Sequence, residues 1–170
     1  MAGERQADKI KGFDFSNSPT ELINTPHKSK DTLVLCTTNG TQALAKTSNA
    51  SRVYSLAFVN LQAVTERIAA EQKDIVIVCS GTHGQLSLDD NLAAGFLLNA
   101  LHNITNIQTN DTGLMLIQWA RSINNIETAL QKAKHYNTLI KKGLKEDIDI
   151  CLSLNTMPIV PIWHQNHFTL

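Results

Sequence analysis

The stretch that decides the fold is CTTNGTQAL, from Cys36 to Leu44. An Asn-Gly pair between apolar runs is a strong signal for a β-hairpin. Here the preceding run, residues 32–38, is short, apolar and β-prone, as in a buried strand. The following run, residues 41–46, contains good helix formers and no β-branched alternation. The sequence therefore predicts a strand, a polar loop and a helix, a geometry that directs backbone N–H groups toward an anion.

Composition limits the class of protein. The 170 residues fit one domain, and fifteen Lys and Arg balance fifteen Asp and Glu. A net charge of zero and only 5% aromatic residues argue against a nucleic-acid surface. The apolar runs are too short to span a membrane, and the polar start resembles neither a signal nor a transit peptide. Three separated cysteines in apolar surroundings indicate reduced thiols, so we expect a cytoplasmic protein.

Strand and helix patterns alternate along the rest of the chain. Further strands are predicted at residues 52–59, 74–79 and 157–163, and helices at 60–72, 87–103, 112–123, 126–143 and 144–154. Asn60, Ser87 and Asp111 are the expected N-caps, and Ser87 with Asp90 forms a capping-box pattern. This order predicts an α/β fold of three layers, with helices around a mainly parallel or mixed sheet. We expect one domain over 1–170, with a loop-rich opening segment (1–30) and a strand and helix core (31–170).

Two predicted strands end in the same kind of loop. TTNGT follows the first and SGTHG follows the strand at 74–79. The carboxyl ends of parallel strands lie on one edge of a sheet, where ligands bind in α/β folds. The alternative for each loop is a helix cap with a tight turn. The expected phosphate-binding residues are Thr37, Thr38, Asn39, Gly40, Thr41, Ser80, Gly81 and Thr82.

Five motifs, in order, give the chain a resemblance to the 2-phosphosulfolactate phosphatase family. They are GER (3–5), GFDFSNSP (12–19), TTNGT (37–41), CSGT (79–82) and LDDNLAAG (88–95). Looser matches lie at residues 134–151 and 160–161, so the resemblance covers nearly the whole chain. It implies Mg²⁺-dependent hydrolysis of (R)-2-phospho-3-sulfolactate to 3-sulfolactate and phosphate. In methanogens this step serves coenzyme M synthesis.

The chain departs from the family pattern at several positions. Gln6 and Ala7 stand where members have a glycine soon after GER, Ser16 replaces a glycine, and Asn137 replaces an arginine. The family also has a preceding strand and an Asp-Val-Leu-Arg-like motif, so we expect an N-terminally truncated version of its sheet. Two alternatives therefore stay open: a non-catalytic anion-binding remnant, and a phosphatase for another small anionic phosphate ester.

The resemblance also suggests catalytic residues. A substrate with phosphate, sulfonate and carboxylate groups needs cations and N–H donors to offset its charge. Arg5 is the expected anion clamp, and its alternative is a surface arginine paired with Glu4. Asp14 is the second expected catalytic residue, while Asn17 and Ser18 would orient phosphate or water. Their alternatives are a turn carboxylate for Asp14 and a helix start for Asn17 and Ser18.

Glu4, Asp14 and Asp89 are the expected Mg²⁺ ligands, because Mg²⁺ takes one or two carboxylates and keeps several waters. Capping is the preferred interpretation for Asp90. A small anionic ester is the expected partner, without nucleic acid or membrane, and an exposed sheet edge leaves a homo-oligomer open.

The sequence gives weaker support for the expected roles of the cysteines and histidines. Cys36 and Cys79 are expected to be small buried packing residues and not nucleophiles. His83 is a candidate general acid, although a lone loop histidine is more often incidental. The structural or exposed histidines are expected to be His135, His164 and His167.

Overall fold

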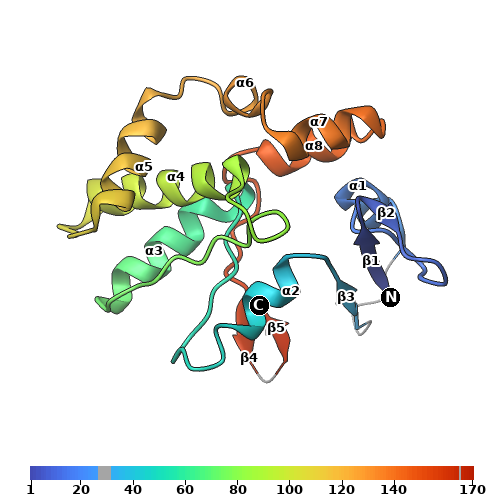
Figure 1. Cartoon of the computed structure of the whole chain (residues 1–170). Helices are drawn as coiled ribbons and strands as arrows, with labels where there is room; N and C mark the ends of the chain where they lie inside the picture. Colours follow the sequence, from blue (N-terminus) through green and yellow to red (C-terminus); the bar gives the residue numbers. More distant parts are fainter. Residues whose placement is uncertain (27–31, 165) are drawn as a thin grey trace.

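The computed structural model describes residues 1–26, 32–164 and 166–170. Figure 1 shows a layer of helices beside two small β-structures. The strands are β1 (Ala2–Arg5), β2 (Asp8–Lys9), β3 (Leu35–Cys36), β4 (Ile162–His164) and β5 (His167–Thr169). The helices are α1 (Pro19–Ile23), α2 (Gly40–Ala45), α3 (Leu61–Glu71), α4 (Leu88–Ile104), α5 (Asp111–Ser122), α6 (Ile126–Leu130), α7 (Lys134–Lys141) and α8 (Lys145–Leu152), with a short 3₁₀ turn, η1 (Phe58–Asn60). In the described part of the chain, we find no helix with the length and apolarity needed to cross a membrane.

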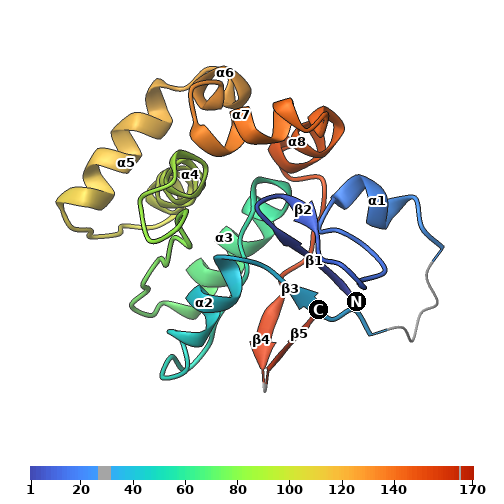
Figure 2. The same cartoon turned by 45° about the vertical axis from the view of Figure 1, so that its right-hand side comes forward.

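The first sheet is mixed and has the order β2-β1-β3. β1 pairs antiparallel with β2 and parallel with β3, where Gly3 stands opposite Cys36. A Cβ on Gly3 would lie 2.3 Å from the Cys36 carbonyl oxygen, so this close approach requires glycine. The second sheet is the β4–β5 hairpin, seen near β3 and α2 in Figure 2. Strands with parallel pairing and interleaved helices confirm the α/β class.

The opening segment holds more structure than the sequence pattern indicated. Residues 1–30 were expected to be loop-rich, yet β1, β2 and α1 form within them. Their residues are polar and their elements short, so neither a period of 2 nor one of 3.6 residues can be recognised. Residues 27–30 of this segment and residue 31 lie outside the described residues.

Two predicted strands are wrong, and a third is shorter than expected. Residues 52–59 form only a single bridge, Tyr54 to Ile162, before η1 begins. Residues 74–79 form no strand, and of 157–163 only the end enters β4. A strand requires a neighbour that completes its hydrogen bonds, and apolar composition alone does not supply one. The strand before CTTNGTQAL is present, although β3 covers only Leu35–Cys36.

Most predicted helices are confirmed. The helix α2 follows the TTNGT loop as predicted, and α3, α4, α5 and α8 match their patterns within a few residues. The single helix predicted at 126–143 is wrong, since α6 and α7 are separate. Ala133 adopts an extended conformation between them, and the Asn137 side chain donates to the carbonyls of Gln131 and Ala133.

The expected caps are only partly correct. Asn60 and Ser87 do precede α3 and α4, but neither side chain caps its helix. The Asn60 side chain instead accepts from the Ala57 N–H and donates to the Ser55 and Ile159 carbonyls. The cap of α5 is Asn110 and not Asp111, because its Oδ1 accepts from the Gly113 N–H at 2.9 Å.

The hydrophobic core is centred on α4, which lies between α3 and α5 (Figure 1). Leu92 packs with Phe58 and Leu130, while Leu97 and Leu101 pack with Leu61 of α3. Burial of these side chains stabilises the helical layer by roughly 1.5–3 kcal/mol each. The helical layer holds the first sheet through α8, whose buried Asp147 accepts hydrogen bonds from residues of the α1 turn.

The turn between β1 and β2 contains Gln6 and Ala7, two of the residues that depart from the family pattern. Gln6 and Ala7 have φ angles of 56° and 60°, in the left-handed region that favours glycine. The Glu4 carboxylate accepts a hydrogen bond from the Ala7 N–H at 3.0 Å and so holds the turn together. The missing glycine therefore leaves a local strain in this turn.

We predict that Ala7→Gly stabilises the protein by about 0.5–1 kcal/mol, because relief of the left-handed strain exceeds the entropic cost of glycine. Urea unfolding at neutral pH measures the change. The matched control, Ala100→Gly inside α4, should lose about 1 kcal/mol. A lower stability for Ala7→Gly would contradict this account of the turn.

Candidate functional site

The first loop of the candidate site connects β3 to α2. Thr38 donates its backbone N–H to Glu4 Oε1 at 2.8 Å, so the loop is fixed to the end of β1. The Thr37 hydroxyl accepts from the Thr41 N–H at 3.3 Å, and the Thr41 hydroxyl donates to the Thr37 carbonyl at 2.9 Å. The loop thus stands at the carboxyl end of β3, as the sequence predicted, and its hydroxyl groups support the start of α2.

The second loop, residues 80–84, precedes α4. Thr82 and Gln85 form an isolated bridge, with reciprocal hydrogen bonds of 2.9 and 3.0 Å. Gly81 has a φ of +70°, and a Cβ there would lie 2.4 Å from the Gln85 carbonyl oxygen, so only glycine fits. The Gly81 N–H donates to Asp90 Oδ2 at 2.6 Å, which fixes the loop to the first turn of α4.

The two loops meet. The His83 N–H donates to Asn39 Oδ1 at 3.1 Å, across 44 residues of sequence. We call the joined residues 37–41 and 80–84 the rim. The structure therefore joins the two loops that contain the eight residues predicted to bind phosphate.

Arg5 lies at the same end of the first sheet. Its guanidinium donates to the Glu4 carbonyl at 3.0 Å and to Cys36 Sγ at 3.3 Å. Among the described residues, it forms no ion pair with the Glu4 carboxylate, which was the alternative considered for it. The side chain is exposed and stands beside Cys36, the residue directly before the first rim loop. Arg5 is therefore placed to offset negative charge at the rim.

Glu4 is a structural acceptor at the rim. Partial burial is the largest influence on its carboxyl and raises the pKa. Hydrogen bonds from the Ala7 and Thr38 N–H groups, together with the charge of Arg5, outweigh it, and the pKa lies below its ordinary value of 4.5. Glu4 is consequently ionised at neutral pH and holds both the β1–β2 turn and the first rim loop.

Asp90 is the residue whose role the sequence pattern did not identify. Its pKa is raised because burial disfavours the charged form, and the charge of Asp89 adds to this, whereas the bond from Gly81 and the charge of His135 lower it. The predicted capping box is therefore wrong, since Asp90 binds the second rim loop and the Ser87 hydroxyl donates to Asp89. An acid with a raised pKa in a cleft is a functional-site candidate. His135, at the start of α7, is exposed, as expected.

Asp14, Asn17 and Ser18 lie elsewhere. Asp14 accepts from the Met1 amino group at 2.5 Å, at the amino end of β1, roughly 10 Å along the strand from the rim. Ser18 caps α1 by accepting from the Glu21 N–H, and donates to Asp147 Oδ1 at 2.7 Å. Asn17 is exposed between them. The structure does not bring these three predicted catalytic residues to the rim.

The predicted metal ligands are likewise separated. Glu4 is bonded to two backbone N–H groups, Asp14 to the amino terminus and Asp89 to Ser87. Within the part of the chain that the structure describes, no three His, Cys, Asp or Glu side chains gather closely enough to hold a metal ion. The residues therefore do not form a ready three-ligand site for Mg²⁺.

The cysteines are free, as predicted, but less buried than expected. Cys36 is half-buried, and Cys79 and Cys151 are exposed. Partial desolvation raises the pKa of the Cys79 thiol, and the charges of Asp90 and Asp89 raise it further. A disfavoured thiolate argues against a nucleophilic role for Cys79.

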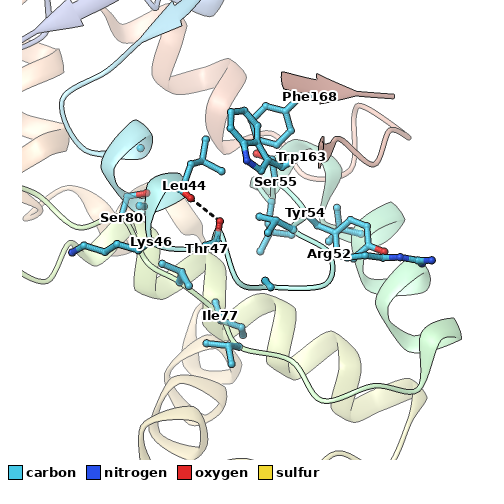
Figure 3. Close-up of a pocket in the computed structure, with 18 of the residues that line it drawn as sticks. Leu44, Lys46, Thr47, Arg52, Tyr54, Ser55, Ile77, Ser80, Trp163 and Phe168 are labelled. Carbon is cyan, nitrogen blue, oxygen red and sulfur yellow. Dashed lines mark hydrogen bonds between the residues drawn. The ribbon is translucent and has the colours of Figure 1, made fainter. Parts of the chain in front are cut away.

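A large cavity adjoins the rim. Its volume is about 1370 Å³, and Thr37, Gly40, Ser80 and Asp90 lie at its border. Figure 3 shows Leu44 and Thr47, Tyr54 and Ser55, Ile77, and Trp163 with Phe168 around this space. The cavity is thus bounded by segments from distant parts of the chain.

These features define a class: an α/β protein in which two hydroxyl- and glycine-rich loops meet. A family comparison gives the particular assignment. The family model of 2-phosphosulpholactate phosphatase matches residues 1–166. The chain therefore belongs to the 2-phosphosulpholactate phosphatase family, a family of phosphoric monoester hydrolases.

Curated relatives agree with the family assignment. The chain is 36% identical over 169 residues to a protein of Clostridium novyi (strain NT), and 35% identical over 170 residues to one of Clostridium beijerinckii. These matches cover 99% of this chain but 72% and 71% of the relatives. A relative in Clostridium perfringens (strain SM101) is 39% identical over 160 residues, which cover 94% of this chain and 64% of that protein. All three are named probable 2-phosphosulfolactate phosphatase.

We predict that Glu4→Gln destabilises the protein at pH 7, because one amide oxygen cannot replace two carboxylate acceptors. The folded-state pKa of Glu4 is lowered, so its contribution is complete above the ordinary value of 4.5 and is lost as pH falls through the folded pKa. The difference in unfolding free energy between wild type and Glu4→Gln should therefore shrink below pH 4.5. Urea unfolding of both proteins, repeated at intervals from about pH 3 to about pH 7, measures this difference in unfolding free energy.

Glu66→Gln, on the exposed surface of α3, is the matched control and should give a small, nearly constant difference. A difference for Glu4→Gln that grows as pH falls would contradict the assigned role.

Proposed function

We propose that the chain hydrolyses (R)-2-phospho-3-sulfolactate to 3-sulfolactate and phosphate at the rim. The observation that carries the proposal is the contact between Asn39 and His83, which joins the two loops of hydroxyl and glycine residues. Membership of the family supplies the reaction class, and the names of the relatives supply the substrate. Phosphoryl transfer depends mainly on positioning and on charge stabilisation, and such loops serve both.

The rim residues would have separate roles in this reaction. Threonine and serine hydroxyls at Thr37, Thr41 and Ser80 would bind the phosphoryl oxygens, and Arg5 would offset the charge that develops on them. Asp90, a partly buried acid whose pKa is raised above its ordinary value, would donate a proton to the leaving oxygen. Roles for Asp14, Asn17 and Ser18 stay predictions from the resemblance.

A divalent cation remains part of the proposal for an electrostatic reason. A substrate with phosphate, sulfonate and carboxylate groups would meet the ionised carboxylate of Glu4 at the rim, and like charges repel. Mg²⁺ held by one or two carboxylates and its own waters would offset this repulsion. Because the described residues form no three-ligand cluster, fewer than three of their His, Cys, Asp or Glu side chains would hold the cation. A cytoplasmic location and the three-layer arrangement of the family fold are likewise proposals, supported by the free cysteines and by the α/β elements.

Binding without turnover is the second candidate function. The Thr38 and Gly81 N–H groups already donate to the carboxylates of Glu4 and Asp90, which reduces the donors left for a substrate. If these carboxylates compete with phosphate, the chain would bind an anion weakly and leave it unchanged.

We predict that purified folded chain releases phosphate from (R)-2-phospho-3-sulfolactate with Mg²⁺ and loses this activity with a chelator. Arg5→Ala should lower kcat/KM about 100-fold, and Arg5→Lys less. Arg121→Ala, which removes an exposed arginine bonded to Asn99 on the helical layer, is the control and should stay within about twofold, as surface substitutions usually do.

Several outcomes separate the candidates. Phosphate binding without release would favour the non-catalytic function. Release from phosphate esters that lack the sulfonate, at equal or higher rates, would assign another substrate. Wild-type activity in Arg5→Ala would remove Arg5 from the site.

A further inference from the structure

The hairpin of β4 and β5 pairs two histidines across its strands. In its antiparallel register His164 stands opposite His167, and Trp163 stands opposite Phe168. Residues that stand opposite each other project from the same face of a sheet, and successive pairs alternate between the two faces. The two imidazoles therefore share one face of the hairpin, where their ring centroids lie 6.4 Å apart.

Contacts on both sides of β4 hold this pair in place. Trp163 and Phe168 are in ring contact, with centroids 4.9 Å apart, as Figure 3 shows. The Trp163 N–H donates to the Val53 carbonyl at 2.9 Å, and the Ser55 N–H donates to the Pro161 carbonyl at 3.0 Å. β4 is thus bonded to β5 and to the segment that precedes η1. Ligands on such supported strands lose little further freedom when they bind one ion together.

The surroundings of the two imidazoles suit a cation from solvent. Both histidines are exposed, as expected, and the hairpin projects away from the helical layer in Figures 1 and 2. The sequence of residues 159–170 contains no Lys or Arg that would repel a cation. Imidazole nitrogen is a preferred ligand of zinc, copper and nickel ions, whereas Mg²⁺ prefers oxygen. The pair therefore selects for a transition-metal ion over Mg²⁺.

The spacing of the two rings is compatible with one shared ion. An ion bound by one nitrogen of each imidazole lies about 3 Å from each ring centroid, because the bond from metal to nitrogen is about 2.1 Å long. At a tetrahedral angle the two centroids would then be about 5 Å apart. The observed separation of 6.4 Å is longer by about 1 Å, and small rotations about the side-chain torsions of two exposed histidines supply this difference.

We propose that His164 and His167 form a two-histidine site for a divalent transition-metal ion of the zinc and nickel class. Each imidazole gives one nitrogen to the ion. Water completes the coordination shell, because the described residues offer no cluster of three His, Cys, Asp or Glu side chains. This hairpin site differs from the Mg²⁺ site proposed at the rim in its ligand chemistry and in the elements that carry it. The proposal is independent of the proposed activity.

The test titrates the whole ¹⁵N-labelled chain with Ni²⁺, in excess Mg²⁺ and with the cysteines kept reduced. Ni²⁺ suits imidazole ligands, and its unpaired electrons broaden the NMR signals of nearby nuclei. The amide signals of residues 162–164 and 167–169 and the indole signal of Trp163 should disappear first, while those of α5 stay sharp. Calorimetry should give one ion per chain at this site.

Matched variants make the result specific. His164→Ala and His167→Ala should each weaken Ni²⁺ binding at least about tenfold, because one of the two ligands is lost. His164→Gln, which keeps a side chain of similar size, repeats the test with less change to the hairpin. The control is His102→Ala, at an exposed histidine in the last turn of α4, and it should leave the affinity within about twofold.

Three results would overturn the proposal. The first is an unchanged affinity in His164→Gln or His167→Ala, because a single histidine would then suffice. The second is signal loss that begins beside Cys36, Cys79 or Cys151, because a thiol would then be the ligand. The third is the absence of Ni²⁺ binding to chain with a folded circular-dichroism spectrum.

Discussion

The hydrogen bond from the His83 backbone N–H to Asn39 Oδ1 is the contact on which the site depends. Thr82 and Gln85 close the second loop on itself, and Asp90 fixes it to α4. Without the bond to Asn39, these contacts would hold that loop on the helical layer and leave the first loop on the small sheet. The bond brings the β-structure and the helices to a common edge. The bond joins the two loops that contain the predicted phosphate-binding residues.

The rim also contains two carboxyl groups, those of Glu4 and Asp90. Glu4 and Asp90 occupy N–H donors of the two loops, one with a lowered and the other with a raised pKa. The difference has a physical cause: Glu4 receives two backbone hydrogen bonds and a nearby guanidinium, whereas Asp90 is more buried and lies beside Asp89. A pair of carboxylates whose environments separate their pKa values is the usual arrangement for assigning a fixed charge and a proton donor. The charge of Glu4 repels a bare phosphate ester, and for this reason a cation belongs in the proposed reaction.

Sequence reasoning predicted the rim loops and the helices well, because both depend on local signals. Glycine with hydroxyl residues after an apolar run, as in TTNGT, and the apolar period of α3 can be read within ten residues. The predictions of strands at residues 52–59 and 74–79 were wrong because strand formation depends on a partner elsewhere in the chain. The sequence pattern assigned Asp90 to a helix cap because it stands three residues after Ser87, the spacing of a capping box. Only the three-dimensional approach of Gly81 shows that it binds a loop instead. The Mg²⁺ ligands and the catalytic roles of Asp14, Asn17 and Ser18 stay predictions.

The most direct test of the central claim, that the two joined loops bind the phosphoryl group, is a titration of ¹⁵N-labelled chain with inorganic phosphate, followed by amide chemical shifts. The account predicts saturable shifts concentrated in residues 37–41 and 80–83, with both loops giving the same dissociation constant. Shifts at only one loop, or at the amino end of β1 beside Asp14, would contradict it.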